Sequence, residues 1–287
     1  MISGPRHTAA FAALLAAGPA FADDPATLFN PVPADALRGM DTDRPNVTNT
    51  PHTIDAGHLQ IETGLFDYTH AHDALAGTDD STDALTLAHV NFRLGILDAL
   101  EVNAALDSVD FFRNTDRVAN RTVKASGVGD LVLGGKLALW GDAGSDAPWA
   151  TALAFQPQIK IPTALAPIGN RHSEYFFGVP FLVNLVADFH LGLQTIASRE
   201  RNLANTGYAT GWRSSASVDH ILFGQLDAYL EYAAHVTTEH GAPAQQTIDI
   251  GATYPLNDNV VLDTGVAFGV TKAAPALEWT AGFSVRF

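Results

Sequence analysis

The ionisable side chains that could do chemistry in this sequence often stand at every second position of an apolar stretch. Asp249, Glu278 and Arg286, for example, each lie between two apolar neighbours. Because successive side chains of a β-strand leave opposite faces, such residues would gather on one face of a sheet. If that face encloses water, its charges select ions by sign. The charged residues predicted to share this inward phase are Glu62, Arg93, Glu101, Asp107, Asp130, Lys136, Lys160, Arg213, Asp227, Glu231, Asp249, Asp263, Glu278 and Arg286.

Two arrangements of this charged face remain open at the level of sequence. Acidic residues outnumber basic ones in the set, so an open pore lined by them would mildly prefer cations. Alternatively, the charges pair across the interior and hold a narrow barrel shut, because small barrels are filled by side chains. The residue types and their spacing do not decide between an open and a closed lumen.

Two other kinds of chemistry are weighed and not favoured. A lipid-facing Ser–His site would hydrolyse esters, and the pattern does not fix which way His89 points, but no Gly-x-Ser-x-Gly motif occurs. His70 and His72 lie near several aspartates and are weak candidates for a divalent ion, although acidic loops are commonly only solvated. We therefore expect no catalytic residue, no cofactor and no dedicated metal site.

Strands of about ten residues would position the charged face. Apolar and polar residues alternate from Gly57 to Phe287, with turn residues between the runs. Leu85 and Leu87 break the phase of their run, which we interpret as a bulge. Strands are predicted at about 58–68, 84–96, 100–107, 129–139, 153–161, 177–186, 189–197, 208–218, 226–235, 245–254, 260–269 and 277–287.

The length of these runs favours a membrane barrel. A tilted strand of about 9–11 residues crosses a bilayer, and such barrels face lipid with apolar side chains and keep a polar interior. Connections after even-numbered strands are short and most of the others are long, as in bacterial outer-membrane barrels. We predict an all-β, antiparallel, up-and-down barrel of about twelve strands in that membrane. A soluble exported lipid-binding barrel is the alternative.

The chain before the strands divides into two parts. Residues 1–22 combine Arg6 and His7 with an alanine-rich apolar run and a small-residue ending, a pattern typical of a secretory signal peptide. Residues 23–56 are rich in proline and are predicted to be an extended periplasmic segment. In a second interpretation this segment folds back into the barrel, where Asp43 and Arg44 would help to plug it. The barrel itself is predicted to span residues 57–287.

Composition argues against several classes of function. The formal net charge of −15 argues against nucleic acid as a partner. The sequence has no cysteine, so disulfides and thiol chemistry contribute nothing. After the first twenty-two residues, no apolar stretch approaches the length of a membrane-spanning helix.

Several short segments resemble a known family when they are taken together. They are Thr42-Asp43-Arg44-Pro45, residues 57–62, 127–131 and 256–265, Ala273-Ala274-Pro275, and residues 283–287. The set is similar to an outer-membrane transporter family named for the meta pathway of phenol degradation. The resemblance covers the chain from about Met40 to its end. It implies a membrane barrel that acts as a transporter, and it carries over no catalytic residue.

The expected function is the passive passage of small solutes, which the resemblance implies are hydrophobic or aromatic. The expected partners are the solute, outer-membrane lipid and lipopolysaccharide, and the barrel-assembly machinery, which would recognise the C-terminal strand ending at Phe287. The main alternative is a non-transporting barrel that is structural or binds lipopolysaccharide or a partner. A lipid-acting barrel enzyme is a third hypothesis.

Overall fold

A computed structural model of the protein describes residues 25–73, 79–141, 145, 147–202 and 204–287, so the predicted signal peptide lies outside it. No helix in these residues is long and apolar enough to cross a membrane. The strands are β1 (Leu59–Asp73), β2 (Asp80–Leu97), β3 (Leu100–Asp116), β4 (Arg121–Gly127), β5 (Leu131–Trp140), β6 (Thr151–Ile161), β7 (Glu174–Asn184), β8 (Phe189–Arg201), β9 (Tyr208–Phe223), β10 (Leu226–Thr237), β11 (Gln245–Asn257), β12 (Val260–Gly269) and β13 (Leu277–Arg286).

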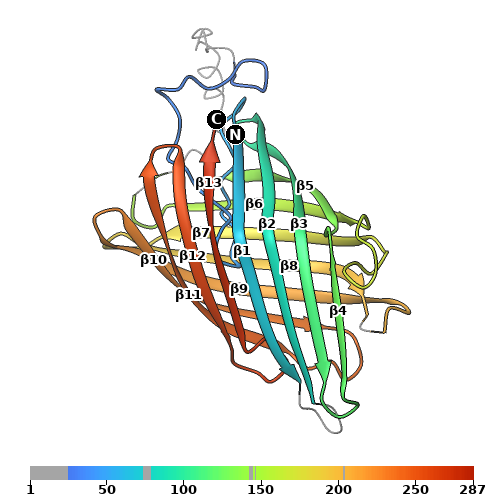
Figure 1. The fold of residues 1–287 in the computed structure, drawn as a ribbon. Coiled ribbons are helices and arrows are strands. Elements are labelled where there is room, and N and C mark those ends of the chain that lie inside the picture. Colours follow the sequence, from blue (N-terminus) through green and yellow to red (C-terminus); the bar gives the residue numbers. More distant parts are fainter. Residues whose placement is uncertain (1–24, 74–78, 142–144, 146, 203) are drawn as a thin grey trace, which may run out of the picture.

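Twelve of these strands close into one antiparallel barrel (Figure 1). Apart from β4, each strand pairs with the next along the chain, and β1 pairs with β13 to complete the circle. β3 pairs with β5 over residues 100–105 and with β4 over residues 110–116, so β4 is an addition to one part of the wall. The predicted fold class, an all-β antiparallel barrel of about twelve strands, is confirmed.

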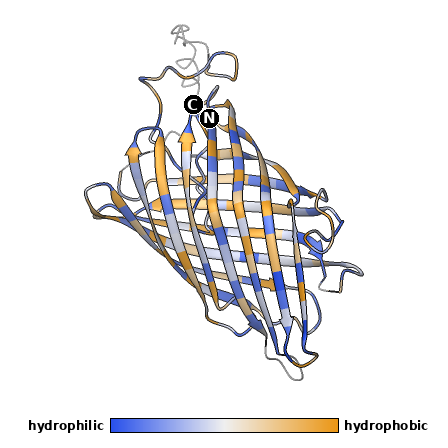
Figure 2. Cartoon of the chain, in the orientation of Figure 1, coloured by the Kyte–Doolittle hydropathy of each residue, from blue (hydrophilic) through white to orange (hydrophobic). Residues whose placement is uncertain are grey.

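The side chains are distributed as a membrane barrel requires, with apolar groups outside and polar groups inside. Leu262 is 41% exposed and Phe155 is 37% exposed, whereas Glu62, Arg93 and Lys136 are at most 1% exposed. Orange and blue segments accordingly alternate along the strands in Figure 2. A soluble barrel would bury the apolar face, so this distribution opposes the soluble alternative.

A change of phase runs across three neighbouring strands. The β1–β13 register shifts between Gly64 and Phe66, and Ala88 of β2 has a positive φ of 55°. On β3 the exposed valines change parity, from Val102 to Val109. The predicted break of phase in the second strand is therefore present, but β2 stays in register with β1 and β3 at this point, and the register shift that marks a bulge lies between β1 and β13.

The strands on this side are longer than predicted, so the loops expected at 69–83 and 110–127 are partly wrong. β1 runs to Asp73, β2 begins at Asp80, and the second expected loop contains the end of β3 and all of β4. The physical reason is that both faces of these extensions are predominantly polar. The apolar alternation stops there, while the backbone hydrogen bonding of the sheet continues.

Glycines in β11 and β12 make room for one aromatic side chain in the lumen. A Cβ atom at Gly251 would clash with the ring of Tyr229 and with the backbone carbonyl of Thr264. We expect Gly251→Val to lower the free energy of unfolding by about 1–3 kcal/mol, the usual cost of overpacking. Urea unfolding of the folded protein in detergent measures this change. Gly207→Val, at a loop position with only an ordinary contact, is the control, and an equal loss in both variants would contradict the prediction.

Candidate functional site

Residues 38–56, here called the inner segment, lie inside the barrel. They occupy the half nearest Leu59 and Phe287, which is the periplasmic half in barrels of this kind (Figure 1). Polar atoms of the inner segment bond to side chains from strands on all sides of the wall. These side chains are Gln60, Glu62, Arg93, Glu101, Lys136, Gln156, Gln194, Ser215, Ser217, Glu231, Asp263, Thr280 and Arg286.

A buried charge cluster joins the inner segment to β1, β2, β3 and β5. The guanidinium of Arg93 lies 2.8 Å from Glu62 and 2.9 Å from Glu101, and the Lys136 ammonium lies 2.8 Å from Asp43. Arg93 also donates to the His52 carbonyl, at 3.1 Å. Buried charges are tolerated when they are paired and hydrogen-bonded, as they are here. The cluster therefore fixes Asp43 against one side of the wall.

Arg44 fixes the inner segment to the neighbouring strands β12, β13 and β1. Its guanidinium lies 3.1 Å from Asp263, donates to the Thr280 hydroxyl at 2.5 Å and lies 3.5 Å from Asp67. Burial disfavours the charged guanidinium, but the carboxylates of Asp263 and Asp67 outweigh this and raise the pKa of Arg44. Asp43 and Arg44, adjacent in sequence, thus reach different parts of the wall.

Glu231 of β10 holds the turn of the inner segment from another side. Its carboxylate accepts hydrogen bonds from the backbone N–H groups of Val47 and Thr48, both at 2.7 Å, and from the Thr48 hydroxyl at 2.5 Å. The Thr48 hydroxyl also lies 2.7 Å from the Ser215 hydroxyl of β9. Charge-assisted bonds to backbone N–H groups are among the stronger hydrogen bonds in proteins.

Contacts within the inner segment give it a defined shape. Asp41 accepts a hydrogen bond from the Thr50 hydroxyl at 2.5 Å, and the Nδ1 atom of His52 lies 2.8 Å from the same carboxylate. Burial alone would raise the pKa of Asp41, but the bonds and charge of His52, together with Thr50, lower it below its usual range. Arg38 closes the loop with a 2.6 Å contact to Asp55.

The remaining predicted charges form smaller groups or stand alone. Lys160 lies 3.3 Å from Asp130 and 2.8 Å from Glu174, and the Nδ1 atom of His89 lies 2.6 Å from Asp107. Arg286 contacts Asp55 of the inner segment at 3.5 Å. Within the described residues, no salt bridge is formed by Arg213, Asp227, Asp249 or Glu278.

A hollow lies on the side of the inner segment that faces away from Leu59 and Phe287, and it is here called the vestibule. Pro45, Asn46 and Val47 contribute to a space of about 200 Å³ that is also lined by Tyr229 and by three acidic residues. These acids are Asp67, Asp249 and Glu278. Solute that enters from the outer side would therefore meet an acidic chamber before it meets the inner segment.

Sequence reasoning missed two inward acids because of the phase change. Asp67 follows the irregularity near Leu65, and Asp110 lies in a stretch expected to be a loop. Asp67 contacts Arg44, and Asp110 accepts a 2.6 Å hydrogen bond from Thr86. If the inward and outward positions are exchanged after the irregularity, Asp67 is predicted to face the lumen. The uncharged inward residues Gln60, Gln156 and Gln194 were also missed as contacts of the inner segment, since only charge was considered.

The histidines considered for catalysis or metal binding are engaged separately. His89 bonds to Asp107, an acid predicted to face the lumen. His70 lies 2.8 Å from Asp83, and His72 lies 2.9 Å from Asp79. In the part of the chain that the structure describes, no three such residues are placed to hold one metal ion.

The closed barrel, its apolar exterior and its polar interior define the class of protein, a bacterial outer-membrane β-barrel. Within that class, the chain belongs to the family described as "Putative MetA-pathway of phenol degradation", whose sequence profile matches residues 42–287. The resemblance found in the sequence is thereby confirmed. The matched region begins inside the inner segment, so most of that segment belongs to the family pattern.

Solved structures support the same fold. An outer membrane channel from Pseudomonas putida F1 superposes with a TM-score of 0.59 at 10% identity, covering 89% of this chain and 99% of that one. The transport unit of the autotransporter AIDA-I from Escherichia coli gives a TM-score of 0.51 at 9% identity, covering 80% of this chain and 89% of that one. No curated protein sequence gives a significant match.

Proposed function

We propose that the protein is a passive outer-membrane channel for small solutes and that the inner segment is its plug. The observation that carries this proposal is a vestibule with three acidic residues in its lining, which ends on a segment held in the lumen by reversible polar contacts and packing. A purely structural barrel needs no such chamber. Apart from the backbone that joins it to β1, the inner segment has no covalent link to the wall, so its displacement would open the periplasmic half of the lumen.

The nature of the solute is proposed from two sources. The family takes its name from a pathway of phenol degradation. Tyr229 adds an aromatic surface to the vestibule. We therefore favour small aromatic or hydrophobic compounds. A deletion strain should grow more slowly than its parent on limiting aromatic carbon sources, and equal growth on all of them would oppose this choice.

A disulfide between the plug and the wall tests whether passage requires movement. The Thr48 and Ser215 hydroxyls lie 2.7 Å apart, and the chain has no native cysteine, so Thr48→Cys with Ser215→Cys creates a single new pair. We expect solute entry into liposomes to fall to the level of protein-free liposomes when the pair is oxidised. Reduction should restore it, because the cross-link holds the inner segment in the lumen.

A second pair provides the matched control. The Thr195 and Ser214 hydroxyls lie 3.0 Å apart on adjacent strands of the wall, so Thr195→Cys with Ser214→Cys forms a cross-link that leaves the plug free. Oxidation of this control should not change solute entry. Equal entry through the oxidised and reduced plug pair would show that solutes pass without movement of the inner segment. If neither form admits solute above background, the non-transporting alternative gains support.

A further inference from the structure

On the outer surface of β1, β2 and β3, the apolar side chains end at one level, which indicates where the hydrocarbon of the membrane ends. The outward apolar runs cover residues 59–68, 85–94 and 102–111, which are ten residues each. That length matches the 9–11 residues of a tilted membrane strand. The runs end in one registered row, in which Tyr68 is paired with Leu85 and Leu85 with Phe111. We take this row as the outer boundary of the hydrocarbon.

The next row outward is charged and contains an unusual pair. Arg113 of β3 stands directly opposite Lys124 of β4. Like charges directly opposite in an antiparallel pair destabilise the sheet, so this arrangement favours an anion between them. In the described part of the chain neither residue forms a salt bridge. The acid in the row, Asp83, stands opposite Arg113 on the other side, and its carboxylate is engaged by the Tyr68 hydroxyl at 2.9 Å and by His70 at 2.8 Å.

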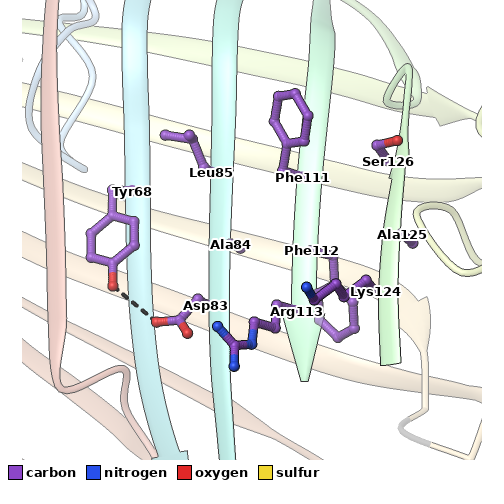
Figure 3. A pocket seen from close by; sticks show the side chains of 10 residues that line it. All are labelled: Tyr68, Asp83, Ala84, Leu85, Phe111, Phe112, Arg113, Lys124, Ala125 and Ser126. Carbon is purple, nitrogen blue, oxygen red and sulfur yellow. Dashed lines mark hydrogen bonds between the residues drawn. The ribbon is translucent and has the colours of Figure 1, made fainter. Parts of the chain in front are cut away.

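A groove joins the apolar row to the charged row (Figure 3). It has a volume of about 520 Å³ and is lined by Tyr68, Leu85 and Phe111 on the apolar side. Its charged side is formed by Arg113 and Lys124 together with one acid, Asp83. Beyond the basic pair, the Thr115 and Thr122 hydroxyls lie 3.4 Å apart on the same two strands. The outward surface along and beyond the groove thus changes from apolar to charged to hydroxyl-bearing at the depth where lipid headgroups begin.

A second basic cluster on the wall lacks these features. Arg199 and Arg201 lie over the ring of Tyr208, at 5.6 and 4.9 Å from its centroid. Arg199 donates to the Thr210 hydroxyl at 3.2 Å, and Arg201 donates to Asn205 at 2.7 Å. Their charges are already engaged by protein groups, so this cluster gives no comparable reason to expect an anion.

We propose that the groove between β1 and β4 binds a phosphorylated glycolipid of the outer leaflet, the lipid A part of lipopolysaccharide. One phosphate lies between Arg113 and Lys124, where charge-assisted hydrogen bonds to a guanidinium and an ammonium are strong. The Thr115 and Thr122 hydroxyls donate to the same headgroup. The first part of an acyl chain packs on Leu85 and Phe111. This inference does not depend on whether the barrel transports solute.

Native mass spectrometry of the folded protein in detergent tests the proposal with defined lipids. Diphosphoryl lipid A should bind the native chain in a one-to-one complex, and the same lipid without its phosphates should bind far more weakly. Arg113→Gln with Lys124→Gln should weaken binding of diphosphoryl lipid A roughly thirtyfold, the combined effect of two basic residues at an anionic lipid surface. Arg199→Gln with Arg201→Gln removes the same charge from the second basic cluster, on β8, and should leave binding unchanged.

Three results would overturn the proposal. One is equal binding of the phosphorylated and dephosphorylated lipids, which needs no variant and decides the matter even if the double variant fails to fold. Another is native-like affinity for diphosphoryl lipid A in the Arg113 and Lys124 double variant, provided that the variant is shown to be folded by its shift in electrophoretic mobility on heating. The third is displacement of lipid A by inorganic phosphate at low concentration, which would indicate a free-anion site in place of a lipid site.

Discussion

Deletion of residues 23–56 is expected to convert a largely closed barrel into an open pore. Planar-bilayer recordings should show conductance several-fold above that of the native chain. The reason is that residues 38–56, which these polar contacts hold in place, would no longer fill the periplasmic half of the lumen. The exposed lumen would carry more acidic than basic side chains, so the current should be cation-selective. Replacing Asp249 and Glu278 of the vestibule by Asn and Gln should reduce that selectivity.

A shorter deletion separates the plug from the chain that precedes it. Removal of residues 23–37 alone leaves every contact of Asp43, Arg44 and Thr48 with the wall, and we expect conductance to stay at the native level. Absence of current after the longer deletion, in protein shown to be folded, would contradict the channel proposal. Preference for anions would contradict the assignment of the inward acids.

Substitution of Arg93 by leucine is expected to lower the free energy of unfolding more than any other single substitution in the lumen. Arg93 is 0% exposed and pairs with Glu62 and Glu101, each 1% exposed. Loss of the guanidinium leaves two buried carboxylates with the more distant Lys136 as compensation. Removal of one partner from a buried ion group typically costs about 3–5 kcal/mol. Urea unfolding followed by tryptophan fluorescence measures the loss of free energy.

Two variants test whether the cost comes from unpaired charge. Arg213→Leu makes the same change at an exposed position of β9 and should alter stability by no more than about 0.5 kcal/mol. Arg93→Leu combined with Glu62→Gln and Glu101→Gln removes the orphaned charges and should recover most of the loss. If Arg93→Leu unfolds at the native urea concentration, the cluster contributes little and another contact holds Asp43.

The local pattern of the sequence predicted the wall well, for a physical reason. Alternation with period two follows directly from strand geometry, and the bilayer fixes the length of the apolar run. Even the irregularity at Leu85 and Leu87 was visible, because a bulge moves each later side chain to the other face. The extensions of β2 and β3 were not visible, since their outward residues Asp83 and Arg113 are charged like the residues of a loop.

The position of the inner segment could be raised as a hypothesis but not decided from sequence. Its contacts join residues far apart in the chain, such as Arg44 with Asp263 and Thr48 with Glu231. No periodicity marks such pairs, and prolines at 45 and 51 fit an extended periplasmic segment equally well. Only the opposite charges of Arg44 and the inward acids gave a hint, and that hint does not specify partners.

The seam between β1 and β13 has a consequence for biogenesis. Backbone hydrogen bonds join Leu59 to Phe287 in both directions, so the first and last strands in chain order are neighbours. Translation and export deliver the inner segment early and β13 late. The barrel therefore stays open until β13 is available to pair with β1. The inner segment is thus available as an internal template on which successive hairpins can assemble before β1 and β13 pair and close the barrel.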